Sequence, residues 1–281
     1  MPAWLLQFSS RLSSFVAVGA RSSSKKSQND SRLAMLLFYQ RPVALNREAH
    51  RAFRIRRSVA RYEFASGTNS LPLVGAEFPR AALEYPIVFA GQLAAQCLPA
   101  ALLGLRDAQN LFVGADGGWL DGAYIPAFAR RYPFVLADAG AGAAAPYTVC
   151  IDEAFDGIGP GQDGEALFDE QGEPARFLRE ALDFLRDYQQ QLQATQAFVH
   201  SLAERELLVQ RSLQMTTPDG EALRLDGFFV VDEQRLRELD DATAAAWFRN
   251  GYLGWIHAHL MSLGQTRALL RRLPPRGGLA N

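Results

Sequence analysis

Residues 174–204 carry the longest helical pattern in the chain, and this pattern constrains the fold more than any other stretch. Side chains that can be buried in a hydrophobic core recur there at alternating intervals of four and three residues, which places them on one face of a helix. Pro174 suits the first turn, where a missing N–H costs nothing. About 30 helical residues span about 45 Å, so the helix must cross a core or protrude from it. The predicted buried face consists of Phe177, Ala181, Phe184, Tyr188, Leu192, Thr195, Val199 and Leu202.

A coiled coil is the competing interpretation of this stretch. The buried face lasts only about four heptads and is interrupted by the polar Thr195, which a coiled-coil seam disfavours. We therefore predict that the helix packs against the protein's own sheet.

The overall composition predicts a sizeable core and argues against a general nucleic-acid binder. Hydrophobic residues make up 48% of the 281 positions, enough for one large domain or two small ones. Nucleic-acid binders carry a basic surplus, whereas the formal net charge here is −1. No apolar run reaches the roughly 18 residues that span a bilayer. We expect a soluble protein without a transmembrane segment, located in the cytoplasm or associated peripherally with the cell envelope.

The first 34 residues differ in kind from the rest. They are rich in Ser, and their basic residues Arg21, Lys25 and Lys26 follow a short apolar patch, the reverse of the order in a secretory signal. We interpret residues 1–34 as a disordered or mis-assigned extension, with Met35 as the natural start. Residues 35–275 are then predicted to form a single domain, strand-rich over 35–155 and helix-rich over 165–275.

Short strands and turns are predicted before the long helix, and a hairpin and further helices after it. Apolar runs at 85–90, 98–105, 110–113, 134–137 and 148–151 indicate strands, with a helical turn at 125–132. The turn at 218–220 joins two alternating runs into a hairpin, and Asp232 and Asp240 or Asp241 are good N-caps for helices at 233–239 and 242–249. A last helix is predicted over 252–272. The fold class is therefore α+β, with mostly antiparallel strands.

The sequence predicts no metal site and no cofactor. Cys97 and Cys150 lie in apolar runs without CxxC spacing and are interpreted as buried free thiols. His257 and His259 are two residues apart on a predicted helix and point in nearly opposite directions, so they cannot share a metal ion. The sequence has no nucleophile elbow, Walker loop, dinucleotide fingerprint or HExxH motif. These observations favour a protein that is not an enzyme.

A basic stretch follows Met35 and has an acidic counterpart. Phe53 and Ile55 alternate with Arg54 and Arg56, which predicts a strand with one apolar and one basic face. Residues 152–173 contain acidic residues but no Lys or Arg. The basic face could hold an anionic ligand, but we expect internal pairing with the acidic block or plain solvation.

Several motifs in order resemble the bacterial SapC family. They are RPVALNREAH at 41–50, GTNSLPLVGAEFP at 67–79, EYPIVF at 84–89, GWLDGAYIPAFARRYPFVL at 118–136, CIDE at 150–153, LFDEQGEP at 167–174, GFFVVDEQRL at 227–236 and AHLMSLG at 258–264. The resemblance covers about residues 35 to 273. The family takes its name from a locus for surface-layer protein transport, which implies an association with the envelope or with export, and it brings no established catalytic residue.

Two classes of function follow from these observations. The first is a non-catalytic accessory or binding protein of the bacterial cell envelope or of protein export, whose partner is another protein of that machinery. The second is an enzyme with an unrecognised site for an anionic or carbohydrate substrate. The oligomeric state and the partner are left open. The candidate ligand-binding residues are Arg47, His50, Arg51, Trp119, Tyr124, Arg130 and Arg131.

Overall fold

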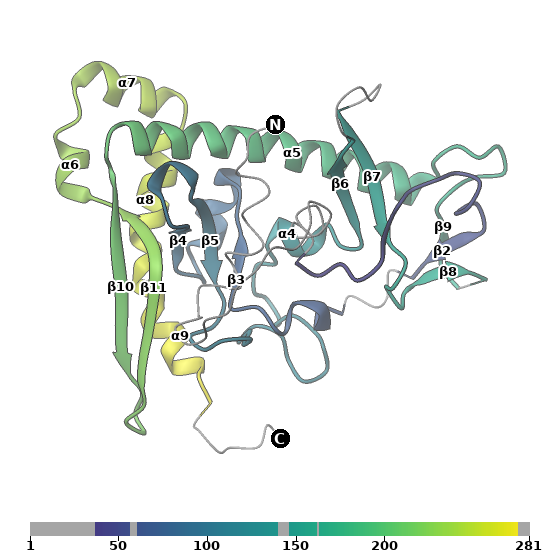
Figure 1. Cartoon of the computed structure of the whole chain (residues 1–281), viewed down its shortest axis with the longest axis horizontal. Helices are drawn as coiled ribbons and strands as arrows, with labels where there is room; N and C mark the ends of the chain where they lie inside the picture. Colours follow the sequence, from purple (N-terminus) through teal and green to yellow (C-terminus); the bar gives the residue numbers. More distant parts are fainter. Residues whose placement is uncertain (1–36, 57–60, 140–145, 162, 275–281) are drawn as a thin grey trace, which may run out of the picture. The chain divides into compact units, whose positions relative to one another are not determined.

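The computed structural model describes residues 37–56, 61–139, 146–161 and 163–274 (Figure 1). Antiparallel sheets and helices are both present, which confirms the α+β class. The predicted extension at 1–34 lies outside the described residues. The described residues divide into two compact units: unit 1 contains residues 37, 62–127 and 191–274, and unit 2 contains residues 38–56, 61, 128–139, 146–161 and 163–190. The prediction of a single domain stays a prediction.

The long helix is present as one element, α5 (Arg176–Glu204), and contributes residues to both units. In unit 2 the ring of Phe177 lies 6.0 Å from that of Phe134, which belongs to a strand. In unit 1 the ring of Phe198 lies 6.2 Å from that of Phe89, also on a strand. The prediction that this helix packs against the protein's own sheets is confirmed. Leu178, Leu185 and Phe198 are buried as well, so the apolar face is wider than the sequence pattern indicated.

Unit 1 is built on a five-stranded antiparallel sheet with the order β10-β11-β4-β5-β3. The predicted hairpin forms its longest strands, which pair along most of their length. The central strands β4 and β5 are fully buried because apolar residues occupy both of their faces. The strands are β3 (Ser70–Pro72), β4 (Ile87–Ala90), β5 (Leu98–Leu102), β10 (Leu208–Thr216) and β11 (Ala222–Val231).

Short helices complete unit 1. Asp232 caps one of them as predicted, and Asp240, one of the two predicted candidates, caps another; in both, side-chain oxygens accept backbone N–H groups. Helix α8 packs against β4, β11 and α3. The helices are α3 (Phe78–Ala81), α6 (Glu233–Arg237), α7 (Asp241–Arg249), α8 (Tyr252–Ser262) and α9 (Thr266–Arg272), with 3₁₀ turns at Glu63–Ala65, Gly75–Glu77, Ala94–Gln96 and Leu263–Gln265.

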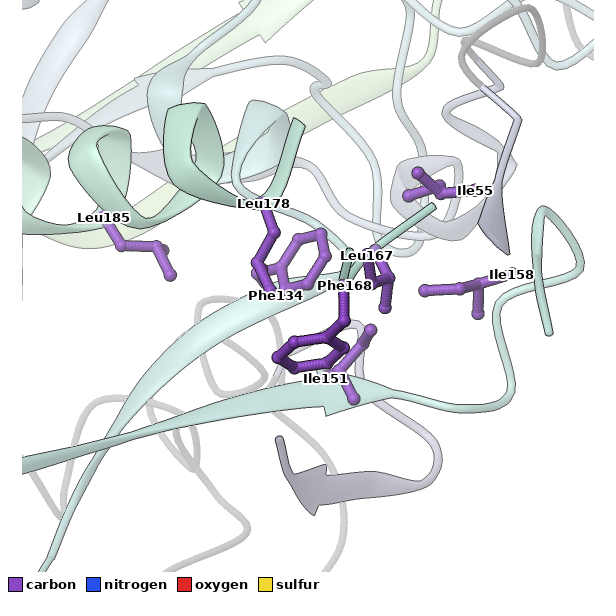
Figure 2. Close-up of a cluster of buried hydrophobic side chains, with 8 residues drawn as sticks. All are labelled: Ile55, Phe134, Ile151, Ile158, Leu167, Phe168, Leu178 and Leu185. Atoms are coloured by element: carbon purple, nitrogen blue, oxygen red, sulfur yellow. The ribbon is translucent and has the colours of Figure 1, made fainter. Parts of the chain in front are cut away.

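Unit 2 contains two small antiparallel sheets with the orders β1-β7-β6 and β8-β2-β9. Figure 2 shows the core of this unit, in which buried side chains from both sheets and from α5 converge. The predicted strand at Phe53–Ile55 is β2, with Ile55 in this core and Arg54 exposed. The other elements are β1 (Pro42–Ala44), α4 (Ala127–Arg130, which begins at the last residue of a unit 1 segment), β6 (Phe134–Asp138), β7 (Tyr147–Asp152), β8 (Ile158–Pro160) and β9 (Glu165–Ala166).

Two predicted elements differ from the structure. Residues 110–113 do not form a strand, because the Asn110 side chain donates to the carbonyl of Ala65 and accepts from the N–H of Phe112, and such local bonds compete with a ladder. The predicted helix 252–272 is divided into α8 and α9 by a 3₁₀ turn at Leu263–Gln265. Gly264 within that turn lowers the helix propensity there.

Candidate functional site

Unit 2 places a buried carboxylate at the end of β7. Asp152 has no exposed surface, yet its side chain accepts four hydrogen bonds. Oδ1 accepts from the backbone N–H groups of Arg41 (2.8 Å) and Ala154 (3.1 Å). Oδ2 accepts from the backbone N–H of Gln40 (2.9 Å) and from the Tyr132 hydroxyl (3.1 Å). Both oxygens are therefore fully engaged, and two of the four hydrogen bonds join the end of β7 to the segment that precedes β1.

The next residue carries the charged part of the same cluster. Glu153 Oε2 lies 3.3 Å from Nε of Arg41, and Glu153 Oε1 lies 3.3 Å from Nε2 of His50. His50 is buried, and its Nδ1 lies 3.0 Å from the backbone nitrogen of Asn46. When Nδ1 accepts that N–H, the ring proton is on Nε2 and faces the Glu153 carboxylate. Arg41, His50 and Glu153 come from the segments 41–50 and 150–153 singled out in the sequence.

The cluster of Arg41, His50 and Glu153 is better suited to holding the end of β7 in place than to catalysis. A histidine beside a carboxylate can hold a proton, but nucleophilic catalysis also needs an activated hydroxyl or thiol within reach. Among the described residues, His50 Nε2 makes no hydrogen bond of good geometry. Burial raises the pKa of the Cys150 thiol on β7, the opposite of activation.

The basic stretch contacts the acidic block through main-chain oxygens. Arg54 Nε donates to the carbonyl of Gly164 (3.0 Å), Arg56 donates to the carbonyl of Asp156 (3.4 Å), and Arg51 donates to the carbonyl of Glu170. The pairing of β2 with β8 and β9 brings these segments together. These contacts favour internal pairing over ligand binding, with carbonyl groups in place of the expected carboxylates.

Reversing Arg51, Arg54 and Arg56 together to Glu tests this pairing. We expect a modest loss of stability, because each exposed contact is worth about 0–1 kcal/mol. High salt should reduce the difference from wild type, since screening acts over about 8–10 Å. Retention on heparin should not change. Melting curves and heparin elution on the same variant measure both effects, with the exposed set Arg211, Arg249 and Arg271 reversed as a charge-matched control. Lost heparin retention with unchanged melting would instead assign an anionic ligand to the basic stretch.

The seven candidate ligand residues fall in both units. Unit 2 holds Arg47, His50, Arg51, Arg130 and Arg131, and unit 1 holds Trp119 and Tyr124. The guanidinium of Arg130 lies over the ring of Phe184, and that of Arg131 lies 4.0 Å from the ring centroid of Phe128.

In unit 1, Trp119 and Tyr124 are linked through a third aromatic residue. Trp119 Nε1 donates to the Tyr85 hydroxyl (3.1 Å), which donates to the Tyr124 carbonyl. Several of the seven residues thus have packing partners of their own, and their use as one ligand-binding set stays a prediction.

Sequence reasoning missed Glu77, a buried carboxylate in unit 1. Its Oε1 accepts from the Tyr124 hydroxyl (2.8 Å) and from the N–H of Ala127 (2.7 Å), and its Oε2 accepts from the N–H of Val74 (2.9 Å). The available signal was a lone acid within the apolar segment GTNSLPLVGAEFP, where an unpaired charge would be costly.

His259 fills a gap between two strands of the unit 1 sheet. β11 pairs with β4 at Phe228↔Ala90 and Phe229↔Phe89, and the same register would bring Val231 opposite Ile87. The imidazole lies there instead. Its Nδ1 donates to the Ile87 carbonyl (2.8 Å), and its Nε2 accepts from the N–H of Val231 (3.1 Å).

Ser262, one turn further along α8, completes the same arrangement. Its hydroxyl accepts from the N–H of Ile87 (2.9 Å) and donates to the carbonyl of His259 (2.5 Å). Burial lowers the pKa of His259 to about 4, so the ring is neutral at neutral pH. His259 and Ser262 therefore take the place of strand residues as hydrogen-bond partners of β4 and β11. Both residues belong to the sequence segment AHLMSLG.

A separate pocket in unit 1 lies between residues 95–98 and α5. Its volume is about 390 Å³, and Gln96, Gln193, Gln196 and His200 line it together with small and apolar side chains. None of the seven candidate residues lines this pocket. Burial raises the pKa of the Cys97 thiol, which also lines it, to about 12, so the thiol is protonated.

The described part of the chain shows neither a metal-binding cluster nor a membrane span. It contains no group of three or more His, Cys, Asp or Glu side chains placed to hold a metal ion. No helix in the same ranges is long and apolar enough to cross a bilayer.

Comparison with known proteins gives one match. The family model described as SapC matches residues 45–269, which is most of the chain and includes the segments around Glu153, Glu77 and His259. No curated protein and no solved structure matches.

Proposed function

The chain belongs to the SapC family, and from this premise we propose that it acts as a non-catalytic accessory or binding protein of the bacterial cell envelope or of protein export. The family name refers to surface-layer protein transport, which supports the cellular setting of the proposal. The partner is another protein of the envelope or export machinery. The protein works from the cytoplasm or in peripheral association with the envelope.

One observation carries the non-catalytic part of the proposal. Three buried groups with catalytic chemistry have their hydrogen bonds committed to the fold: Asp152 and Glu77 accept mainly backbone N–H groups, and His259 bridges two strands. A catalytic acid or base must instead reach the proton of a substrate. The protonated thiols of Cys97 and Cys150 support the same conclusion.

The second candidate function, an enzyme acting on an anionic or carbohydrate substrate, rests on the pair of His50 and Glu153. Their 3.3 Å separation and the free hydrogen-bonding capacity of His50 Nε2 among the described residues are compatible with a proton-transfer pair. Arg41 beside them could balance the charge of a substrate. The pair lacks a neighbouring activated nucleophile among the described residues, so it ranks second.

Affinity purification from cells that make the tagged protein at its native level tests the main proposal. We expect envelope or export proteins to be enriched over a tagged, unrelated protein of similar size, in both wild type and a His50→Gln variant. Quantitative mass spectrometry measures the enrichment. Two results together would reject the binding function in favour of the enzyme. The tagged protein would purify without an enriched partner, and it would turn over an anionic sugar in a reaction that is lost in His50→Gln.

A further inference from the structure

The pocket of unit 1 between residues 95–98 and α5 has two walls without charge. Residues 191–203 of α5 contain no Asp, Glu, Lys or Arg, and neither do residues 85–105, which include β4, β5 and the loop between them. Each turn of the first half of α5, by contrast, carries charged side chains. Several residues of the uncharged stretch of α5 are exposed, where a solvated helix normally carries charge. The loss of charge on α5 therefore coincides with the pocket.

Glutamine residues supply the polar groups of this pocket. Gln193, Gln196 and His200 follow one another at intervals of three and four, so they lie on the same face of α5. Gln96 belongs to the opposite wall. Within the described ranges, the side-chain amides of Gln96, Gln193 and Gln196 make no hydrogen bond to another residue. Gln189 of the same helix differs, because its amide donates to the Tyr147 hydroxyl (2.9 Å). Three amides at the pocket thus keep both donors and acceptors for a ligand.

The remaining lining is small or aliphatic. Cys97, Leu98 and Val199 are buried, and Ala95 and Ala197 add little bulk. The Cys97 thiol donates to the Ala94 carbonyl (3.0 Å), so it is engaged within the loop. No aromatic ring, on which a sugar commonly stacks, belongs to the described residues that line the pocket. A volume of about 390 Å³ is at the small end of the usual range for ligand pockets.

These properties select the chemistry of the ligand. A charged group would lose water without gaining a countercharge, which disfavours acids, phosphates and amines. A peptide backbone offers N–H and C=O groups that match the glutamine amides, and an aliphatic side chain matches the lining of Leu98 and Val199. We propose that this pocket binds a short, uncharged, extended peptide segment with an aliphatic side chain. The inference rests on the proposed function only in assigning this segment to the partner protein.

Titration with a neutral peptide tests the site directly. The full chain, labelled with ¹⁵N at glutamine, is titrated with the capped tripeptide acetyl-Ala-Val-Ala-amide. We expect the side-chain amide signals of Gln96, Gln193 and Gln196 to shift, and that of the exposed Gln191 to stay in place. Single Gln→Ala variants assign the signals. Capped tripeptides with Asp or Lys in place of Val should bind about tenfold more weakly or worse, because the pocket offers no countercharge.

Matched variants on α5 make the test specific. Ala197→Leu should abolish the shifts by filling the pocket, whereas Ala194→Leu, at an exposed position outside it, should leave them unchanged. Gln196→Ala should weaken binding about two- to tenfold through the loss of one hydrogen bond, and Gln191→Ala should not. Circular dichroism should show the wild-type helix content in all four variants.

Three results would overturn the inference. The first is no shift of the three signals at any soluble concentration of the tripeptide, and the second is an equal shift in Ala197→Leu. The third is a shift with N-acetylglucosamine but not with the tripeptide, which would assign the pocket to a sugar.

Affinity purification with Ala197→Leu and Ala194→Leu separates this inference from the proposed function. We expect the protein enriched by wild type to be lost with Ala197→Leu and kept with Ala194→Leu. Enrichment that is equal for wild type and Ala197→Leu would overturn the inference and leave the proposed function standing. Binding of the tripeptide without any enriched protein would leave the peptide site standing and contradict the proposed function.

Discussion

Asp152→Ala should destabilise unit 2 by several kcal/mol or prevent it from folding. The change leaves four donors without an acceptor: the backbone N–H groups of Gln40, Arg41 and Ala154, and the Tyr132 hydroxyl. Each unsatisfied buried group costs about 1–3 kcal/mol. Hydrogen exchange at the amides of residues 40, 41 and 154, together with urea unfolding, measures the effect.

Two further variants make this prediction specific. Asp152→Asn keeps one acceptor oxygen and should lose less stability than Asp152→Ala, because only the donors facing the new amide group become unsatisfied. Asp156→Ala removes an exposed acid nearby and should leave unfolding within error of wild type. Equal protection of the three amides in wild type and Asp152→Ala would show that the carboxylate does not hold this segment.

Lowering the pH from 7 to about 4.5 should remove a large part of the stability of unit 1 through His259. Burial lowers its folded pKa to about 4 from the ordinary value of 6.5, so the unfolded chain takes up a proton first as the pH falls. The stability that depends on the neutral His259 ring is fully present above pH 6.5 and is lost as the pH falls toward 4. A shift of this size corresponds to about 3 kcal/mol. Urea unfolding at a series of pH values measures how the free energy of unfolding changes with pH.

Variants separate His259 from the carboxylates that titrate in the same range. His259→Phe should lower the stability at pH 7, because the Ile87 carbonyl and the Val231 N–H lose their partner, and it should flatten the dependence between pH 6.5 and 5. His257→Gln, a change at an exposed histidine of the same helix, should keep the wild-type slope. The same slope in wild type and His259→Phe would contradict the prediction.

Elements that depend on local periodicity could be predicted from the sequence. The spacing of Phe177, Tyr188 and Val199 was sufficient to predict α5, and the alternation around the turn at Pro218 predicted the β10–β11 hairpin. Asp232 could be predicted as a cap, and the second cap could be narrowed to Asp240 or Asp241, because an N-cap acts on residues two or three positions away.

Features that depend on distant partners could not be predicted. The donors to Asp152 lie up to 112 residues away, and no local pattern distinguishes this acid from an exposed one. His259 was considered only as a metal ligand, since its strand partners at Ile87 and Val231 become visible only in the sheet. The candidate site was predicted from residue types alone, which is why Trp119 and Arg131 were grouped although they belong to different units.

The interleaving of the two units has a consequence for synthesis on the ribosome. Phe38–Arg61 belongs to unit 2, but the rest of that unit begins only at Phe128. The backbone N–H of Arg41 bonds to a carboxylate that is made 111 residues later. At about 5–20 residues per second, the nascent segment waits roughly 6–22 s for this partner. During that interval the apolar side chains of Phe53 and Ile55 lack the partners that bury them in the folded unit. A cell that makes this protein in quantity should therefore depend on chaperones that shield nascent chains.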